Sequence, residues 1–413
     1  MKKPLLLLFL AYFPVMLFSQ DDKTFGIKFT GFVKTDVIWD SRQTVDLREG
    51  HFLLLPKPVL NDLEGNDINA KPSFNFLSIQ TRLKGDITGP DALGAKTSGS
   101  IEGEFFGMAD GDINGFRLRH AYVKLNWKTT ELLVGQMWHP MFITSSFPEV
   151  VSFNTGAPFL VFSRNPQIRL TKDIKSFRLI LTALSQVDFK SNGPDGASTK
   201  YIRNSSIPSF NLNFEYSYKN KETGTEILAG AAGNFKRLLP RMITDSGYQT
   251  NEGINSLSGM VYLKLGFQKV IFKMAGLYGQ NMFDYTMIGG YVVDDYLDKD
   301  KGIVSYRNIT TASVWAEVMT TGKKMQGGLF LAYSQNMGAG DIVIGPYYSR
   351  GANIYDLYRI SPRFVYNAGK FRIAPEIEYT VARYGMTNNL DGKVMDPEPV
   401  GNFRLLVGVF YFF

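Results

Sequence analysis

Apolar and polar residues alternate along most of this chain, and the alternation is clearest over residues 401–413. There every second side chain from Phe403 to Phe413 is apolar, whereas Asn402 and Arg404 occupy the opposite parity. A period of two residues is that of a β-strand whose two faces meet different surroundings. In water, a final strand this apolar would be an exposed edge strand prone to aggregation. In a closed barrel in lipid, the same strand is hydrogen-bonded to a neighbouring strand on each side. The pattern therefore favours a transmembrane barrel over a soluble sandwich.

The same alternation recurs along the chain and predicts about sixteen strands. In one of the clearest, Phe210, Leu212 and Phe214 oppose Asn211 and Asn213. We expect strands at about 26–40, 73–86, 98–108, 116–127, 132–138, 166–172, 176–189, 208–218, 225–236, 254–266, 269–281, 308–320, 325–336, 355–367, 370–383 and 401–413.

Two kinds of connection alternate between these strands. Mostly short turns are expected at about 87–97, 128–131, 173–176, 219–224, 267–269, 321–324 and 368–370. Mostly longer loops are expected at 41–72, 109–115, 139–165, 190–207, 237–253, 282–307, 337–354 and 384–400. An even strand number with short periplasmic turns and long extracellular loops is typical of outer-membrane barrels. The predicted fold class is all-β, an antiparallel up-and-down transmembrane β-barrel of about 16 strands.

The first twenty residues have the features of a secretory signal peptide. Lys2 and Lys3 precede an apolar stretch, and Ser19 and Gln20 provide a small and polar exit near which we expect cleavage. Residues 21–413 are then expected to form a single barrel domain in the outer membrane of a Gram-negative cell. The chain has no cysteine, so an exported protein of this size must be held together without disulfides.

A barrel of about sixteen strands is too wide for side chains to fill and leaves an aqueous channel. The sequence therefore predicts a porin for the passive diffusion of small hydrophilic solutes. Two alternatives are a surface adhesin or structural barrel and, less favoured, a barrel hydrolase. Only His51, His120 and His139 are present, without a nucleophile elbow, so no enzymatic activity is expected.

Inward-facing charges are the candidate determinants of selectivity. Arg117 and Arg119 share the parity of the apolar residues of their strand. Either a β-bulge near His120 turns them inward, which we favour, or they lie above the apolar band. Loop 139–165 is the candidate constriction, although an external cap remains an equal alternative. Arginine donates paired hydrogen bonds to carboxylates and phosphates, which favours anions such as carboxylates. An equal alternative is that these residues are solvated lumen charges paired with one another. The predicted pore-lining residues are Arg82, Lys84, Glu102, Glu104, Arg117, Arg119, Lys124, Arg169 and Arg178.

Net charge and composition limit the kinds of partner that the protein can have. The net charge of +7 includes the two lysines of the leader and leaves 7 − 2 = +5, which is too weak to indicate nucleic-acid binding. The expected partners are small anionic or polar solutes, outer-membrane lipid and lipopolysaccharide, two further copies in a homotrimer, and the barrel-assembly machinery through the strand ending at Phe413. The calcium-like run Asp110–Gly115 has Ala121 where a bidentate glutamate is required, so no metal or other cofactor is expected.

Three motifs carry a resemblance to a known family. Residues 31–40 (GFVKTDVIWD), 76–83 (FLSIQTRL), and 118–123 (LRHAYV) with 133–138 (LVGQMW) resemble the DcaP-like outer-membrane porins of the Bacteroidetes type, and the resemblance covers roughly residues 26–185. It implies a trimeric sixteen-stranded barrel for small, often anionic solutes, with Arg82, Arg117 and Arg119 in the lumen. The chain departs from the family in the run Trp138-His139-Pro140 and in lacking a helical periplasmic extension.

Overall fold

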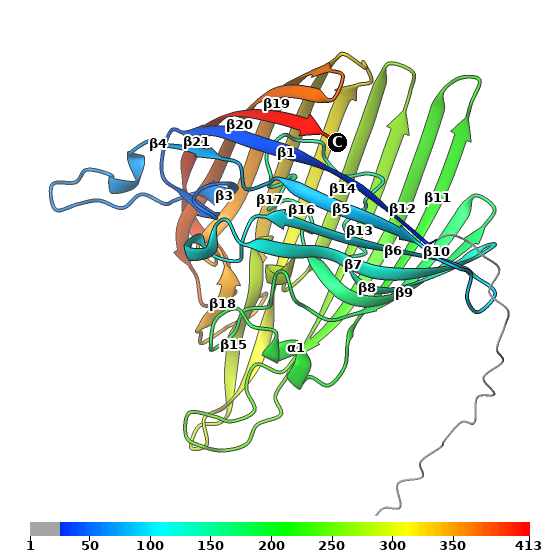
Figure 1. Ribbon diagram of the computed structural model, residues 1–413. Coiled ribbons are helices and arrows are strands. Elements are labelled where there is room, and N and C mark those ends of the chain that lie inside the picture. The colour runs from blue at the N-terminus through cyan, green and yellow to red at the C-terminus, as the bar shows by residue number, and fades with distance from the viewer. Residues whose placement is uncertain (1–24) are drawn as a thin grey trace, which may run out of the picture.

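The computed structural model describes residues 25–413, which form a closed antiparallel β-barrel (Figure 1). The expected signal peptide at residues 1–20 lies outside the described residues. The ring has sixteen strands when β4 and β5 are counted as one interrupted strand. In order they are β1 (Gly26–Asp40), β4 (Ser73–Leu77) with β5 (Arg82–Thr88), β6 (Lys96–Phe105), β7 (Phe116–Trp127), β8 (Thr130–Trp138), β9 (Arg164–Ile174), β10 (Phe177–Leu184), β11 (Ser209–Asn220), β12 (Thr225–Leu238), β13 (Ile254–Gly266), β14 (Val270–Gln280), β16 (Ile303–Thr320), β17 (Met325–Gly338), β19 (Ile354–Ala368), β20 (Phe371–Thr387) and β21 (Val394–Phe412).

The first and last strands close the ring. β1 pairs with β21 from Phe32 opposite Phe412 to Asp40 opposite Arg404, and on its other side it pairs with β4 and β5. The backbone of Phe413 exchanges hydrogen bonds with Gly31 in both directions, at 3.1 and 3.3 Å. No edge strand is left open at this seam, which satisfies the backbone polar groups of the terminal strand.

Some segments that we expected to be loops contain secondary structure. A hairpin of β2 (Thr44–Leu47) and β3 (Phe52–Pro56) follows β1, and β15 (Gly289–Asp298) and β18 (Tyr347–Arg350) pair beyond the end of the barrel wall. The wall strand β16 also begins five residues before the predicted start at 308. The remaining elements are helix α1 (Lys200–Asn204) and short 3-10 turns at Ile68–Ala70, Asp110–Asp112 and Phe283–Tyr285.

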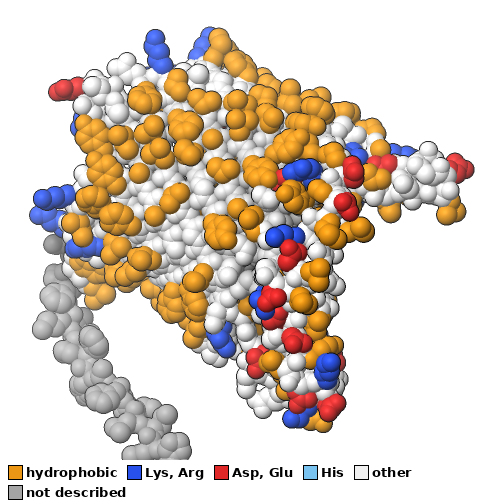
Figure 2. All heavy atoms as spheres, turned by 180° about the vertical axis from the view of Figure 1, so that it is seen from behind, with side chains coloured by type: hydrophobic (Ala, Val, Ile, Leu, Met, Phe, Trp, Pro, Cys, Tyr) orange, Lys and Arg blue, Asp and Glu red, His pale blue; other side chains and the backbone are white. Residues whose placement is uncertain are grey.

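The outer surface of the barrel is apolar, as the alternation predicts. On β11, Phe210, Leu212 and Phe214 are exposed, whereas Asn211 and Asn213 are buried inside. Figure 2 shows apolar side chains spread over the wall, with charges gathered on the protruding loops. An apolar outer belt around a partly polar interior is the arrangement of a transmembrane barrel.

Among residues 25–413, no helix is both long enough and apolar enough to cross a membrane.

The predicted strand at 176–189 is too long. β10 ends at Leu184, and the chain then turns inward, so that Phe189 packs against Phe52 and Phe162 inside the barrel instead of facing outward. The periodicity predicted the wrong strand end because the residues after Leu184 still alternate between apolar and polar although their backbone has left the sheet. Asp188 faces inward, as predicted, and contributes to the charged wall described below.

Candidate pore constriction

The segment between β8 and β9, residues 139–163, crosses the lumen. Lys34 Nζ on β1 donates a hydrogen bond to the carbonyl of Val151 at 2.8 Å. The Glu376 carboxylate on β20 accepts from the backbone N–H groups of Val151 at 2.6 Å and Ser152 at 3.2 Å. These partners are inward side chains of strands far from β8 and β9. The segment therefore lies within the barrel and is not an external cap, which answers the question that the sequence left open.

Arg359 on β19 connects two loops to the wall. Its side chain is fully buried, and its two terminal nitrogens donate to the carbonyl of Ala157 at 2.8 Å and to that of Leu54 at 3.1 Å. Its Nε donates to the Thr380 hydroxyl at 2.8 Å. Leu54 belongs to β3, in the first long loop after β1, and Ala157 belongs to the lumen-crossing segment, which is the third long loop. One guanidinium therefore fixes these two loops together.

A cluster of phenylalanines fills part of the lumen between these loops. Phe106 and Phe153 stack with ring centres 3.8 Å apart, and Phe52 lies 5.0 Å from Phe162. All four rings are at most 3% exposed. The expectation that a barrel of this width is simply water-filled is therefore incomplete, because loop side chains form a dry core across part of the interior.

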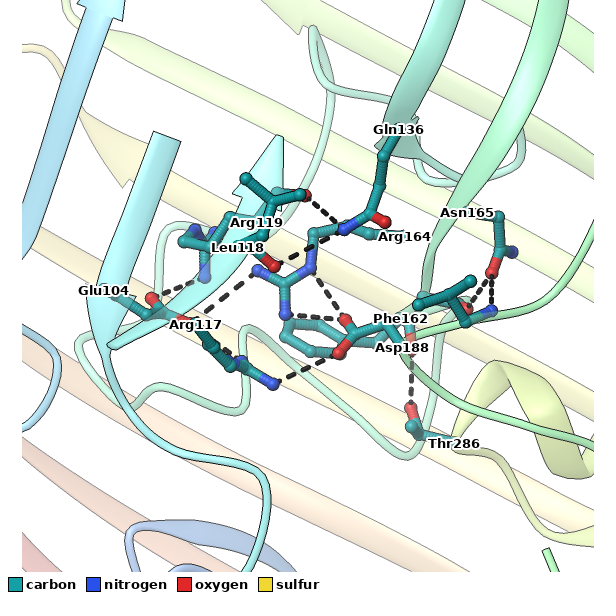
Figure 3. A network of polar contacts seen from close by, with 12 residues as sticks. Glu104, Arg117, Leu118, Arg119, Gln136, Phe162, Arg164, Asn165, Asp188 and Thr286 are labelled. Atoms are coloured by element: carbon teal, nitrogen blue, oxygen red, sulfur yellow. Dashed lines mark hydrogen bonds and ion pairs between the residues drawn. The ribbon is translucent and has the colours of Figure 1, made fainter. Parts of the chain in front are cut away.

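The wall formed by β5, β6 and β7 presents a network of ion pairs to the lumen (Figure 3). Glu104 is fully buried, and one of its oxygens accepts from Arg117 at 2.7 Å. The other oxygen accepts from Arg119 at 2.6 Å and from Arg82 at 3.1 Å. Glu102 binds Arg119 at 2.6 Å. Such charge-assisted pairs fix the directions of the guanidinium planes.

The network continues to the loop after β10. Asp188 accepts a hydrogen bond from Arg164 Nε at 2.8 Å, forms an ion-pair contact of 2.7 Å with the same guanidinium, and accepts from Arg117 at 3.1 Å. Burial would raise the pKa of Asp188, but Arg164 and Arg117 outweigh that effect and hold its pKa below the usual value. With Arg82 and Arg119, four arginines face the three carboxylates of Glu102, Glu104 and Asp188, and 4 − 3 leaves one positive charge.

The predicted β-bulge in β7 is confirmed. Glu102 on β6 lies opposite His120, and the next residue, Gly103, lies opposite Leu118, so Arg119 has no partner in the ladder. One extra residue reverses the parity of the strand. Arg117 and Arg119 are consequently buried in the lumen, while Leu118 is half exposed on the outside.

A cavity of about 470 Å³ lies between the lumen-crossing segment and this wall. Residues 147–153 and Phe142 line it from the loop. Its charged lining from the strands and loop comprises the cations Lys34, Arg82, Lys84, Arg119, Arg363 and Arg372 and the carboxylates Glu102 and Glu149. Among the described residues, Arg372 forms no ion pair; its Nε donates to the Asn367 side chain at 2.8 Å.

A second cavity, of about 400 Å³, reaches the short turns. It shares Met137, Phe142 and Thr144 with the first, so the loop separates the two spaces. Its charges are mixed, because Lys124 binds Glu131 at 3.0 Å and Arg178 binds Asp173 at 2.7 Å.

The nine predicted pore residues fall into two groups. Arg82, Glu102, Glu104, Arg117 and Arg119 form one connected network, and Lys84 lies at the edge of the first cavity, where it pairs with Asp86 at 2.9 Å. Lys124, Arg169 and Arg178 line the second cavity. Their role in selectivity stays a prediction.

The pore-lining residues predicted from the sequence do not include several residues of the constriction. Lys34, Glu376 and Arg363 all lie at inward positions of their strands, and parity alone could have found them. Arg164 gave no such signal, because it stands at the boundary between the third loop and β9.

The three histidines have structural contacts. His51 shares a hydrogen bond of 2.8 Å with Asp36 and fixes the hairpin of β2 and β3 to β1. His139 accepts from the N–H of Met141 at 3.2 Å, and burial lowers the pKa of His139 to about 3. His120 lies on β7 with its Nδ1 3.8 Å from a Glu102 oxygen. Of the three, His51 therefore connects a loop in the lumen to the wall.

Comparison with known proteins identifies the fold. No family model and no curated relative matches the sequence. The structure is similar to the outer-membrane channel DcaP of Acinetobacter baumannii, with a TM-score of 0.68 at 15% identity, over 96% of this chain and 99% of that one. It is also similar to the trimer form of the outer-membrane protein OmpT of Vibrio cholerae (TM-score 0.55, 10% identity, 94% and 99% covered) and to OprB of Pseudomonas putida (0.50, 11%, 94% and 94%).

The barrel, its apolar belt and the segment across its lumen define a transmembrane β-barrel with the porin fold. Within that class, the fold is the one seen in the DcaP channel. The resemblance found in the sequence motifs is thereby confirmed for the fold.

Proposed function

We propose that this protein is an outer-membrane porin through which small hydrophilic solutes diffuse passively, with a preference for anions such as carboxylates. The observation that carries the proposal is the lining of the 470 Å³ cavity, which has six cationic side chains and two carboxylates. Five of these cations pair with carboxylates of the wall, whereas Arg372 forms no ion pair among residues 25–413 and supplies the unpaired positive charge. Rings of one charge in a narrow pore raise the local concentration of the opposite ion. Because a loop narrows the lumen at this place, the unpaired charge of Arg372 lies close to a solute that enters the cavity.

The reversal potential of the reconstituted protein in a salt gradient tests both parts of the proposal. Stable conductance steps with the anion more permeant are expected. A barrel that is silent in the bilayer would favour an adhesin or a structural barrel and would refute the porin. A conducting pore with equal or cation-favouring permeability would refute only the anion preference.

Arg372 is the most informative single position, because no carboxylate depends on it for neutralisation among residues 25–413. Arg372→Gln removes one positive charge from the cavity and should shift the reversal potential toward the cation. Lys299→Gln is the matched control, since it removes one positive charge from an exposed external loop and, among residues 25–413, Lys299 forms no ion pair of 4 Å or less. An equal shift in the two variants would show that selectivity is not set at this cavity.

We further propose a homotrimer, export by the leader at residues 1–20, contact with lipopolysaccharide at the outer rim, and recognition of the strand ending at Phe413 by the barrel-assembly machinery. The exposed Phe413 ring, on a paired terminal strand, supports the last of these. Migration of the unheated protein on a gel tests the trimer, and a variant lacking Phe413 tests assembly by its yield in the outer membrane.

A further inference from the structure

Lysines surround the end of the barrel at which β1 begins and β21 ends. Six of its seven connections are turns of two to four residues: 128–129, 175–176, 221–224, 267–269, 321–324 and 369–370. Each contains an exposed lysine, and the turn lysines of this rim are Lys128, Lys175, Lys221, Lys269, Lys324 and Lys370. Figure 2 shows Lys and Arg side chains at this margin of the apolar wall, on the side away from the protruding loops.

The charge of this rim is one-sided. The six turns contain seven lysines, with Lys323 as the seventh, and a single carboxylate, Glu222. Among the described residues, none of the turn lysines takes part in an ion pair of 4 Å or less; Lys324 lies over the ring of Tyr366 at 5.7 Å. By contrast, Lys299 and Lys301 on an external loop alternate with Asp298 and Asp300. A surface kept polar for solubility alone mixes the two signs, as that loop does.

The turn lysines also stand at a defined depth. Phe177, Phe267 and Phe371 are 40–51% exposed on the outer wall, and each lies within two residues of a turn lysine. At a rise of about 3.3 Å per residue, two residues span about 7 Å, which is less than a Debye length at physiological salt. Outward aromatic residues at the margin of a barrel mark the level of the lipid headgroups. The ammonium groups of Lys175, Lys269 and Lys370 are therefore held at or just beyond that level, and the other turn lysines lie in equivalent turns of the same rim, where Lys128 also lines the second cavity.

We propose that the ring of turn lysines binds the phosphodiester groups of anionic glycerophospholipids in the periplasmic leaflet. The turns are too short to carry the charges toward a partner deep in the periplasm, whereas headgroup phosphates lie within reach of every turn. A lysine near an anionic lipid surface is attracted to it, and the contributions of several lysines add. The inference depends on the barrel spanning a membrane and not on what passes through it, so a failure of the transport proposal leaves it intact.

Spin-labelled phosphatidylglycerol and phosphatidylcholine measure the association directly. The full chain is reconstituted in phosphatidylcholine bilayers, and the motionally restricted fraction of each label is compared by electron spin resonance. The test variant changes the ring, K128Q, K175Q, K221Q, K269Q, K324Q and K370Q. The matched control changes six lysines of the opposite end, K57Q, K71Q, K190Q, K299Q, K301Q and K393Q.

The wild-type protein should prefer phosphatidylglycerol severalfold, and 1 M salt should abolish the preference. In the ring variant, the ratio of the restricted fraction of phosphatidylglycerol to that of phosphatidylcholine should lie within twofold of one. The control variant should keep the wild-type ratio. A triple variant, K128Q, K269Q and K370Q, should show an intermediate ratio and serves if the sixfold variant does not fold. An unchanged ratio in the ring variants, or an equal loss in ring and control variants, would overturn the proposal. The proposal would also be overturned if the wild-type protein showed no lipid preference and added peptidoglycan fragments shielded its turn lysines from acetylation. The ring would then bind an acidic polymer and not a lipid.

Discussion

Replacing Arg359 by methionine should release both loops that occupy the lumen while the barrel wall remains intact. The substitution keeps a long apolar stem but removes the donors to the carbonyls of Leu54 and Ala157. A hydrogen bond from a charged group contributes about 1.5–3 kcal/mol, so two bonds give about 3–6 kcal/mol for the attachment of these loops. The substitution also removes an ion-pair contact of 3.5 Å between Arg359 and the buried Glu378 carboxylate. Glu378 keeps a partner in Asn154, whose amide donates to it at 2.7 Å, so the carboxylate is not left alone.

Hydrogen exchange of the amides in residues 139–163 is the appropriate assay, because it reports local opening without requiring the barrel to unfold. At the lower bound of about 3 kcal/mol, the open population rises roughly a hundredfold, and protection falls by the same factor. Single-channel current should become noisier as the loop moves. Arg237→Met is the control, since the side chain of this partly exposed arginine donates, within the described part of the chain, only to Asn255 at 3.1 Å. Exchange at the wild-type rate in Arg359→Met would refute the idea that this guanidinium holds the constriction.

Three further variants test the surrounding structure. Asp188→Asn removes the ionised partner of Arg164, so the pore gains one positive charge and its reversal potential should move toward the anion; equal potentials would count against this wall as part of the ion path. Because the pKa of Asp188 is lowered on folding, its contribution to stability should be complete above about pH 4 and should disappear as the pH falls through the lowered value, which acid unfolding of wild type and Asp188→Asn can compare. Gly135→Ala places a Cβ 2.2 Å from a backbone carbonyl at φ +137°, so a loss of about 1–3 kcal/mol is expected from thermal unfolding, and an unchanged midpoint would contradict it. Phe153→Ala removes the ring stacked on Phe106 and should cost about 3–5 kcal/mol, visible as faster exchange in the same loop; a loop as protected as in the wild-type protein would show that the dry core does not hold it.

The strands of the wall could be predicted because their signal is local. Each strand of a barrel meets an apolar outside and a different inside, so a period of two is written into every wall segment regardless of its neighbours. The bulge near His120 was also readable, because Arg117 and Arg119 conflicted with the parity of Val123 and Leu125 further along the same strand. A charged pair on an apolar face has few explanations other than a change of register.

The course of the third loop has no such signal. Its backbone groups are satisfied by Lys34, Glu376 and Arg359, which are more than a hundred residues away along the chain. Nothing in the sequence of the loop distinguishes a segment that crosses the lumen from one that covers its mouth. The phenylalanine cluster was missed for the same reason, since Phe52, Phe106 and Phe153 come from three different loops.

The barrel and its inward charges thus follow from the order of residues, because alternation acts over two positions and needs no partner. The connected network around Glu104, the dry part of the lumen and the narrow cavity exist only once the ring has closed. They depend on side chains from distant strands meeting across a space whose width is set by the number of strands.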